Sequence, residues 1–178
     1  MFDFLPIETE RVRVRQFYVD DAFSFHSWRD NPDVARYTLW EYPYSMEEAE
    51  AFCAEQAGYR TFPVGGWCQL LVEERALGKA IGDVGLGIHV AGEDSLTLGY
   101  SLHPNYWGKG YMYEALSRLI PSLHKALSLK CIKATIDARN PASGKLLERL
   151  GFEAGPLVKQ AAFVKGEWCD EYDYELSL

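Results

Sequence analysis

The sequence predicts an α/β or α+β domain, in which helices flank a single mixed, mostly antiparallel sheet of about seven strands. Two patterns carry this prediction. Short runs of alternating apolar and polar residues, typical of strands, occur near both ends and in the middle of the chain. Stretches with apolar residues three or four positions apart, typical of helices, separate them. No repeat or linker-like change of composition interrupts the 178 residues, so we expect one domain over residues 1–178.

The N-terminal part of the chain predicts a strand and two helices. Alternation of apolar and basic side chains indicates the strand, and apolar residues at helical spacing indicate the first helix. Ser45 precedes Glu48 by three residues, the spacing of a capping box, which marks the start of the second helix. In order, these elements are expected at Arg11–Phe17, from a cap at Asp20 or Asp21 to Asn31-Pro32, and from Ser45 to about Gly58.

The middle of the chain predicts three strands and the most regular helix. The glycines of the second strand indicate a bulge or a backbone that another group approaches closely. The helix after Gly110 has one continuous apolar stripe, and Pro121 should bend it near residues 117–121 because proline removes a backbone donor. The strands are expected at Trp67–Glu73, Ala80–Val90 (with Gly82, Gly85 and Gly87) and Leu96–Leu102, with a hairpin turn at residues 91–94.

The C-terminal part predicts a strand, a short helix and a final pair of strands. Pro141 suits the first position of a helix, and Gly151 is expected to end that helix. The expected elements are a strand at Lys130–Ala138, a helix from Asn140-Pro141, strands at Phe152–Val158 and Tyr172–Leu178, and a hairpin around Lys165-Gly166.

Composition and charge exclude several classes of protein. No apolar run approaches the roughly 18 to 20 residues that span a bilayer, and the N-terminus lacks the pattern of a signal peptide. The net charge of −8 disfavours binding to nucleic acid or to an anionic membrane. The four cysteines are widely spaced, which predicts separate reduced thiols, no metal site and a cytoplasmic location.

A glycine turn joins the last of the middle strands to the most regular helix. Gly108 and Gly110 lie in this turn, directly before the helix begins. Unpaired backbone N–H groups and the positive end of the helix dipole make such a start an anion site, and glycine lets a phosphate come close. The spacing fits neither a Walker loop nor a dinucleotide fingerprint. A phosphate-binding turn of another kind is therefore expected.

The turn and three other segments resemble a known family. Asn105-Tyr-Trp-Gly-Lys-Gly resembles the [RQ]-x-x-G-x-[GA] cofactor signature of the GNAT superfamily of N-acetyltransferases. The chain is similar above all to the branch that contains the ribosomal-protein alanine and serine N-acetyltransferases, and the resemblance covers nearly the whole chain. It implies a fold of the acyl-CoA N-acyltransferase type. The further matching segments are Asn31-Pro-Asp-Val, Asn140-Pro-Ala-Ser with Leu147-Glu-Arg-Leu-Gly-Phe, and Gly166-Glu-Trp-Cys-Asp-Glu-Tyr.

The resemblance implies that acetyl-CoA is the co-substrate. Its diphosphate would bind the backbone amides from Gly108 to Met112, and its pantetheine arm would pair like an extra strand with the edge at Tyr100–Leu102. Asn105 stands where the family usually has arginine or glutamine, which bears on affinity. The cofactor-binding residues so implied are Tyr100, Ser101, Leu102, Asn105, Gly108, Lys109, Gly110, Tyr111, Met112, Asn140 and Ser143.

Two polar residues near the start of the short helix are candidates for catalysis. Taken alone, Asn140 and Ser143 are typical of helix capping. The resemblance implies instead that Asn140 contacts the cofactor arm and that Ser143 protonates the departing thiolate. Many relatives have a tyrosine for this task at the position of Leu147.

No residue is identified as the general base. Thr97 and Ala162 stand where this branch often carries glutamate. A neutral amine is needed for attack, so a carboxylate, a histidine or a chain of water must take the proton. The remaining candidates are Glu41, Glu93, Asp94, His26 and His103.

The acceptor is expected to bind near the first two helices. The candidate residues there are Trp28, Tyr37, Trp40 and Glu41, although core aromatics beside surface acids give the same pattern. The first hypothesis is an acetyl-CoA-dependent N-acetyltransferase of a peptide or protein N-terminal amine. The alternatives are acetylation of a small amine, such as a polyamine or an aminoglycoside-like antibiotic, and an acyl-CoA-binding module without turnover. The partner is an amine-bearing acceptor, and a homodimer is compatible with the sequence.

Overall fold

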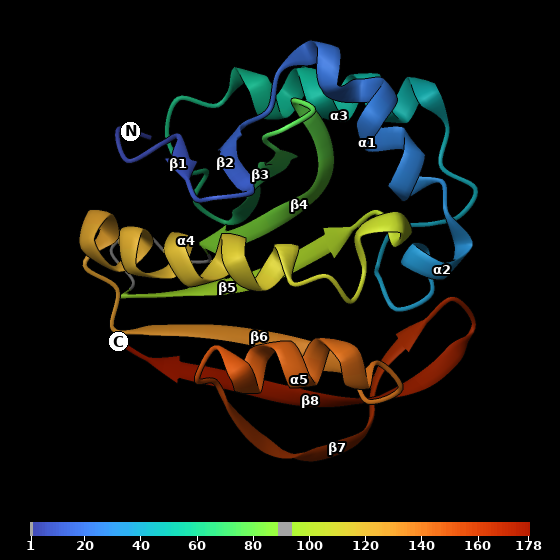
Figure 1. The fold of residues 1–178 in the computed structure, drawn as a ribbon. Helices are drawn as coiled ribbons and strands as arrows, with labels where there is room; N and C mark the ends of the chain where they lie inside the picture. The colour runs from blue at the N-terminus through green and yellow to red at the C-terminus, as the bar shows by residue number, and fades with distance from the viewer. Residues whose placement is uncertain (1, 89–93) are drawn as a thin grey trace.

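One mixed sheet dominates the computed structural model, which describes residues 2–88 and 94–178. Within these residues, eight strands occur in the order β1-β2-β3-β4-β5-β6-β8-β7 (Figure 1). Neighbouring strands are antiparallel except β5 and β6. The strands are β1 (Ile7–Glu8), β2 (Val12–Gln16), β3 (Gly66–Glu74), β4 (Lys79–Ile88), β5 (Ser95–Leu102), β6 (Cys131–Asp137), β7 (Glu153–Val164) and β8 (Glu167–Ser177). The predicted mixed, mostly antiparallel sheet is confirmed.

Helices cover both faces of this sheet. In Figure 1, α1 and α3 lie on one face, and α4 and α5 lie on the other. Each pair covers its own hydrophobic cluster, and the cluster under α4 and α5 is the larger of the two. The helices are α1 (Ala22–Arg29), α2 (Pro32–Ala35), α3 (Met46–Gly58), α4 (Tyr111–Leu127) and α5 (Pro141–Arg149), with short 3₁₀ helices η1 (Val19–Asp21) and η2 (Pro104–Tyr106).

Helix α4 buries the apolar stripe that its sequence predicts. Met112, Leu116, Leu119 and Leu123 are all buried against β2 to β6, which fixes the start of the helix beside the end of β5. Burial of a leucine side chain stabilises a fold by about 2 kcal/mol, so this stripe holds the helix firmly. Pro121 lies inside α4, which remains one helix across it; the bend near residues 117–121 stays a prediction.

The two predicted helix starts in the N-terminal part differ in outcome. The capping box is confirmed: Ser45 Oγ accepts from the Glu48 amide at 3.2 Å, and Glu48 Oε2 accepts from the Ser45 amide at 2.8 Å. Asp21 does occupy the position before α1, but its carboxylate does not cap α1; it accepts from the Tyr18 amide at 2.7 Å, at the start of η1. The same carboxylate also accepts from the buried Arg15 guanidinium at 2.7 and 2.8 Å, a charge-assisted pair.

The glycines of β4 permit close approach, as expected. A Cβ added to Gly82 would lie 2.4 Å from the Ser101 carbonyl oxygen, and one added to Gly85 would lie 2.8 Å from the Gln69 amide group. The register between β3 and β4 also shifts beside Val72, which is the expected irregularity. Of the predicted hairpin turn at residues 91–94, positions 91–93 lie outside the described residues.

The C-terminal hairpin is longer than the sequence predicts. β7 and β8 pair from Glu153 with Glu175 to Val164 with Glu167, around a turn at Lys165 and Gly166. Both turn residues have left-handed backbone angles, which is typical of tight hairpin turns. The sequence did not predict the middle of this hairpin, because β7 is mostly exposed and has no alternating pattern of buried residues.

The cysteines behave as packed thiols. Cys53, Cys68, Cys131 and Cys169 are all free, and burial raises the pKa of Cys53 and of Cys68 to about 12, so these two thiols stay protonated. Within residues 2–88 and 94–178, no group of histidine, cysteine and carboxylate side chains is arranged to hold a metal ion. No helix in the described part of the chain is both long and apolar enough to cross a membrane.

Candidate active site

The glycine turn before α4 has the geometry that its sequence predicts. Gly108 and Gly110 have φ angles of 69° and 81°, in the left-handed region that glycine adopts without strain. Gly110 stands directly before α4, and the helix start has no side-chain cap. The first-turn amides of Tyr111 and Met112 therefore point toward the turn without a side-chain acceptor, as an anion site requires.

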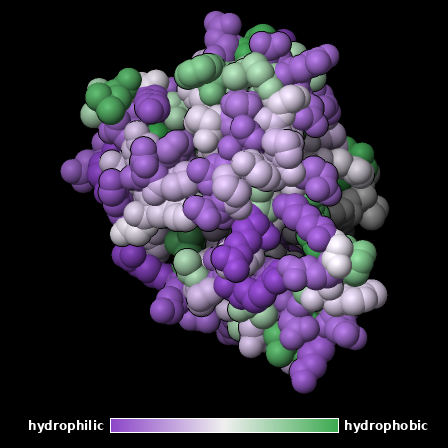
Figure 2. Space-filling view, turned by 90° about the vertical axis from the view of Figure 1, so that its right-hand side faces the viewer, coloured by the Kyte–Doolittle hydropathy of each residue, from purple (hydrophilic) through white to green (hydrophobic). Residues whose placement is uncertain are grey.

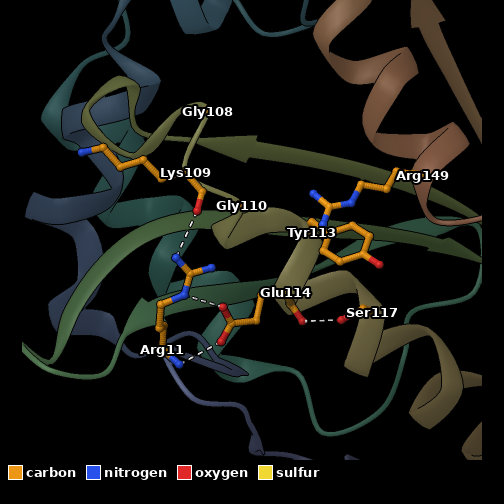
Figure 3. Close-up of a pocket in the computed structure, with 8 residues that line it drawn as sticks. All are labelled: Arg11, Gly108, Lys109, Gly110, Tyr113, Glu114, Ser117 and Arg149. Atoms are coloured by element: carbon orange, nitrogen blue, oxygen red, sulfur yellow. Dashed lines mark hydrogen bonds and ion pairs between the residues drawn. The ribbon is translucent and has the colours of Figure 1, made fainter.

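Arg11, directly before β2, contacts this turn and holds it in place, which sequence reasoning missed. Arg11 Nη1 donates to the Lys109 carbonyl oxygen at 3.0 Å, and Arg11 Nε pairs with Glu114 Oε2 at 2.6 Å (Figure 3). Thr9 Oγ1 also donates to Glu114, at 2.6 Å. Partial burial alone would raise the pKa of Glu114, but these hydrogen bonds and the charge of Arg11 outweigh it and lower the pKa. No local pattern links residues a hundred positions apart, so only the fold reveals this brace.

A pocket of about 490 Å³ opens at the same place. Its size falls in the range of sites for small ligands. Figure 3 shows that its wall combines the glycine turn, the first two turns of α4, Arg11 directly before β2, and the end of α5. The lining residues are Arg11, Gly108, Lys109, Gly110, Tyr113, Glu114, Ser117 and Arg149.

The strand that leads into the turn is unpaired on one side. β5 pairs with β6 only from Ser95 with Cys131 to Thr97 with Lys133, whereas it pairs with β4 as far as Leu102. The two strands therefore separate beyond Thr97, and Tyr100 and Ser101 lie on the edge of β5 where the pantetheine arm is expected to pair. The edge ends at Leu102, whose carbonyl oxygen accepts from Trp107 Nε1 at 2.6 Å.

Two hydroxyl groups meet beside this edge. Ser143 Oγ lies 2.7 Å from the Tyr100 hydroxyl, which also donates to the Ser143 carbonyl oxygen at 3.2 Å. Burial raises the pKa of Tyr100 to about 12, although its hydrogen bond with Ser143 opposes the rise. The phenol thus stays protonated at neutral pH. The sequence pointed to the backbone of Tyr100 and not to its hydroxyl group.

The start of α5 holds Ser143 in place. Asn140 Oδ1 accepts from the Ser143 amide at 3.3 Å, so its carboxamide oxygen does cap the helix. A Cβ added to Gly144 would lie 2.8 Å from the Tyr174 hydroxyl oxygen, which shows how closely α5 approaches β8. Leu147 is fully buried and has no hydroxyl group. The hydroxyl groups beside the free edge of β5 are those of Ser143 and Tyr100.

The remaining predicted cofactor residues lie near the turn. Asn105 is exposed in η2, and its carbonyl oxygen accepts from Lys109 Nζ at 2.7 Å. Tyr111 lies under the Arg11 guanidinium, 4.6 Å from its ring centroid. The Met112 side chain is buried in the core, so only its backbone amide faces the turn.

Trp28 is a core residue, and its expected place on an acceptor surface is wrong. Its side chain has 0% exposure, and its Nε1 donates to Asp83 Oδ1 at 2.8 Å. Arg29 Nη2 lies 3.3 Å from the other Asp83 oxygen. Burial raises the pKa of Asp83, while the charge of Arg29 and the two side-chain hydrogen bonds oppose that rise. An aromatic run cannot reveal in advance which ring turns inward.

The other predicted acceptor residues separate into two places. The Arg29 guanidinium lies over the Trp40 ring, 3.7 Å from the ring centroid. Trp40 Nε1 donates to the Arg29 carbonyl oxygen at 3.2 Å. Tyr37 is half-buried, and the guanidinium of Arg139 lies 6.0 Å from its ring centroid. Glu41 is exposed.

The C-terminal hairpin reaches the segment that contains Tyr37. Lys165 Nζ donates to the Ala35 carbonyl oxygen, which joins the hairpin tip to α2. Arg139, beside Tyr37, pairs with Asp137 at 2.6 Å and with Glu167 at 2.7 Å. The hairpin and α2 thus meet on the face that Figure 2 shows, which is mainly hydrophilic.

The candidate bases have other partners or lie elsewhere. Exposed Asp94 pairs with Lys130 at 2.7 Å, which lowers the pKa of Asp94. His26 lies 3.8 Å from Asp30, and His103 Nδ1 accepts from the Asn105 amide. Glu93 lies outside the described residues.

Sequence reasoning missed one carboxylate group, that of Glu171, which the sheet register places beside other acidic residues. Glu171 on β8 lies directly opposite Asp137 on β6. Burial raises the pKa of Glu171, and the nearby Asp173 and Asp137 add to the rise. The alternation of residues 171–176 could have placed these acids on one face, opposite the buried tyrosine of β8.

Comparison with known proteins identifies the class to which this fold and site belong. Residues 11–153 match the Acetyltransferase (GNAT) domain. The chain therefore belongs to the GNAT family and is an acetyltransferase of that type. An uncharacterized N-acetyltransferase, YoaA of Bacillus subtilis, is 28% identical over 177 residues, which cover 96% of this chain and 95% of YoaA.

Two solved structures share the fold. Ribosomal-protein-S5-alanine acetyltransferase from Vibrio fischeri superposes with a TM-score of 0.81 at 24% identity, covering 97% of this chain and 96% of that one. Spermidine N-acetyltransferase from Vibrio cholerae, in complex with CoA and spermine, superposes with a TM-score of 0.79 at 20% identity, covering 95% and 96%.

Proposed function

We propose that this acetyltransferase binds acetyl-CoA and transfers the acetyl group to the N-terminal amine of a peptide or protein. The observation that carries the proposal is the free edge of β5, which runs directly into the glycine turn before α4. An extended chain of amides can pair with that edge, and a diphosphate suits the turn at its end. Solved relatives that bind CoA or acetyl-CoA support this choice of co-substrate.

In this proposal, the chain positions the thioester and supplies a proton. The acceptor nitrogen bonds to the acetyl carbon, and the bond from that carbon to sulfur breaks. Ser143 donates the Oγ proton to the departing thiolate and regains one through the Tyr100 hydroxyl, 2.7 Å away, which takes a proton from solvent water and stays neutral. The acceptor amine loses its proton to solvent water, and proximity accounts for much of the rate.

A small cationic amine is the second candidate acceptor. Glu171, Asp137 and Asp173 gather on β6 and β8, where Glu171 lies opposite Asp137 in the sheet register, and Arg139 pairs with Asp137. Like charges on neighbouring strands destabilise a sheet, and a bound cationic amine would offset the repulsion that Asp173 and Asp137 exert on Glu171. The likeness to a spermidine acetyltransferase supports this candidate, and the likeness to an S5-alanine acetyltransferase supports a peptide.

Release of free thiol from acetyl-CoA tests the proposal. Peptides with N-terminal alanine or serine, spermidine and an aminoglycoside are supplied in parallel. We expect turnover with a peptide; turnover with spermidine alone would favour the second candidate. Tight cofactor binding without thiol release from any amine would leave a binding module.

Replacing the proposed proton donor tests the mechanism. We expect Ser143→Ala to lower kcat roughly 100-fold, the lower range for loss of an acid catalyst, with little change in acetyl-CoA affinity. Ser122→Ala is the control, because the Ser122 hydroxyl donates to the Arg118 carbonyl oxygen within α4 and Ser122 does not line the pocket. Unchanged turnover in Ser143→Ala would remove Ser143 from the mechanism.

A further inference from the structure

The three basic side chains of the pocket differ in how their charges are compensated. Arg11 is paired with Glu114 at 2.6 Å, and Lys109 Nζ donates to the Asn105 carbonyl oxygen. Arg149 has no carboxylate within ion-pair distance among residues 2–88 and 94–178. Its guanidinium instead lies over the Tyr113 ring, 3.8 Å from the centroid. Arg149 therefore brings an uncompensated positive charge to the pocket.

Arg149 stands at a different part of the pocket from the phosphate-binding turn. In Figure 3 it projects from α5 over Tyr113, which is one turn of α4 beyond Gly110, while Gly108 and Lys109 form the opposite side. The backbone amides at the helix start account for one anionic group. A planar guanidinium held on an aromatic ring is suited to a second, because its fork binds two phosphate oxygens at once.

Coenzyme A carries two such groups, a diphosphate and a 3′-phosphomonoester on its ribose. We propose that Arg149, held in place by Tyr113, binds the 3′-phosphate of coenzyme A, while the glycine turn holds the diphosphate. This inference rests on the proposed function, since it concerns the same co-substrate. It adds a specificity: the protein distinguishes coenzyme A from its 3′-dephospho form.

Arg149 also has a simpler structural role that the test must separate. It lies in the last turn of α5, where a cation stabilises the helix through the exposed carbonyl groups. A purely structural role predicts that replacing Arg149 lowers stability and weakens both forms of coenzyme A equally. The proposed role predicts a loss confined to the form that carries the 3′-phosphate.

Calorimetric titration of the full-length protein with coenzyme A and with 3′-dephospho-coenzyme A tests the proposal. We expect the wild type to bind coenzyme A about ten-fold more tightly, the ratio that about 1.4 kcal/mol gives. In Arg149→Gln the two dissociation constants should become equal, with that for the dephospho form unchanged. Arg149→Lys should retain part of the ratio, because lysine keeps the charge but not the fork.

Arg118→Gln is the matched control, because Arg118 is an exposed arginine on α4, the helix that carries Tyr113, but does not line the pocket. It should keep the wild-type ratio. Adenosine 3′-phosphate should compete with coenzyme A for the wild type better than for Arg149→Gln. Equal competition by inorganic phosphate at the same concentration would instead assign Arg149 to a general anion site.

The outcomes separate this inference from the proposed function. A wild type that binds both forms with equal affinity would overturn the 3′-phosphate subsite and leave the proposed function intact. Equal weakening of both forms in Arg149→Gln would also overturn it. A wild type that binds neither form would overturn the proposed function itself.

Discussion

At the scale of single residues, the pair formed by Ser143 and Tyr100 is the most consequential contact of the site. Their hydroxyl oxygens lie 2.7 Å apart, beside the free edge of β5. The resemblance drew attention to Ser143, because asparagine and serine at a helix start otherwise read as caps. Nothing in the sequence indicated that the Tyr100 side chain would turn toward α5. That contact depends on how far β5 and β6 separate.

Tyr100→Phe separates positioning from simple packing. The variant keeps the ring and loses the hydroxyl group, so we expect kcat to fall about ten-fold or more while KM for acetyl-CoA changes little. Tyr106→Phe is the control, since Tyr106 contributes its ring to contacts with His103 and Tyr111. Equal activity in Tyr100→Phe and wild type would show that Ser143 acts without it.

The raised pKa of Tyr100 adds a second readout for the same variant. Because the pKa in the folded protein is about 12, against 10.0 for the free side chain, unfolding releases a proton in the interval between these values. The contribution of the Tyr100 hydroxyl to the free energy of unfolding is fully present below about pH 10 and declines as the pH rises toward 12. Chemical unfolding should therefore show a steeper loss above pH 10 in the wild type than in Tyr100→Phe.

Prediction from the sequence failed where the orientation of a side chain mattered. Trp28 and Trp40 lie in one aromatic-rich segment. Trp28 is fully buried and donates to Asp83, whereas the Trp40 ring stacks with the Arg29 guanidinium. Composition predicts such a cluster but not which ring turns inward. The Arg11–Glu114 pair was equally hidden, because only tertiary structure brings β2 to the start of α4.

At the scale of elements, the turn between β5 and α4 was the most predictable part of the site. The glycines, the end of an alternating strand and the start of a helical stripe all lie within a few residues, so local patterns define it. The capping box of α3 was predictable for the same reason. The extent of β7 was not, because its mostly exposed residues give no periodic signal.

Gly110→Ala tests whether the shape of the turn matters. The φ angle of 81° is unfavourable for alanine by about 1 kcal/mol, while space for the Cβ is adequate, with Arg11 Nη2 at 3.5 Å. We expect a small loss of stability and a loss of coenzyme A affinity of about ten-fold, because the amides rotate away from the diphosphate. Calorimetry and thermal unfolding measure the two effects.

Gly58→Ala is the control for this change. Gly58 ends α3, its φ angle is not positive, and an added Cβ meets nothing within 4 Å. Alanine there should leave affinity unchanged. Wild-type affinity in Gly110→Ala would show that the turn does not need its left-handed backbone.

At the scale of the whole molecule, the sheet is divided where β5 and β6 separate. β1 to β5 form one part and β6 to β8 the other, joined along the sheet by three residue pairs. Helices α4 and α5 cover one face beside this opening, and the hairpin of β7 and β8 meets α2 through Lys165. Sequence order predicted the succession of elements, but strand order is a long-range property and came only from the fold.

The central claim is that the backbone amides of residues 108–112 hold the diphosphate of a thioester carrier. A crystal structure of the protein with coenzyme A tests it most directly. The account predicts the diphosphate oxygens against these amides and the pantetheine arm along Tyr100 and Ser101. A diphosphate bound elsewhere, or no coenzyme A bound at saturating concentration, would contradict it.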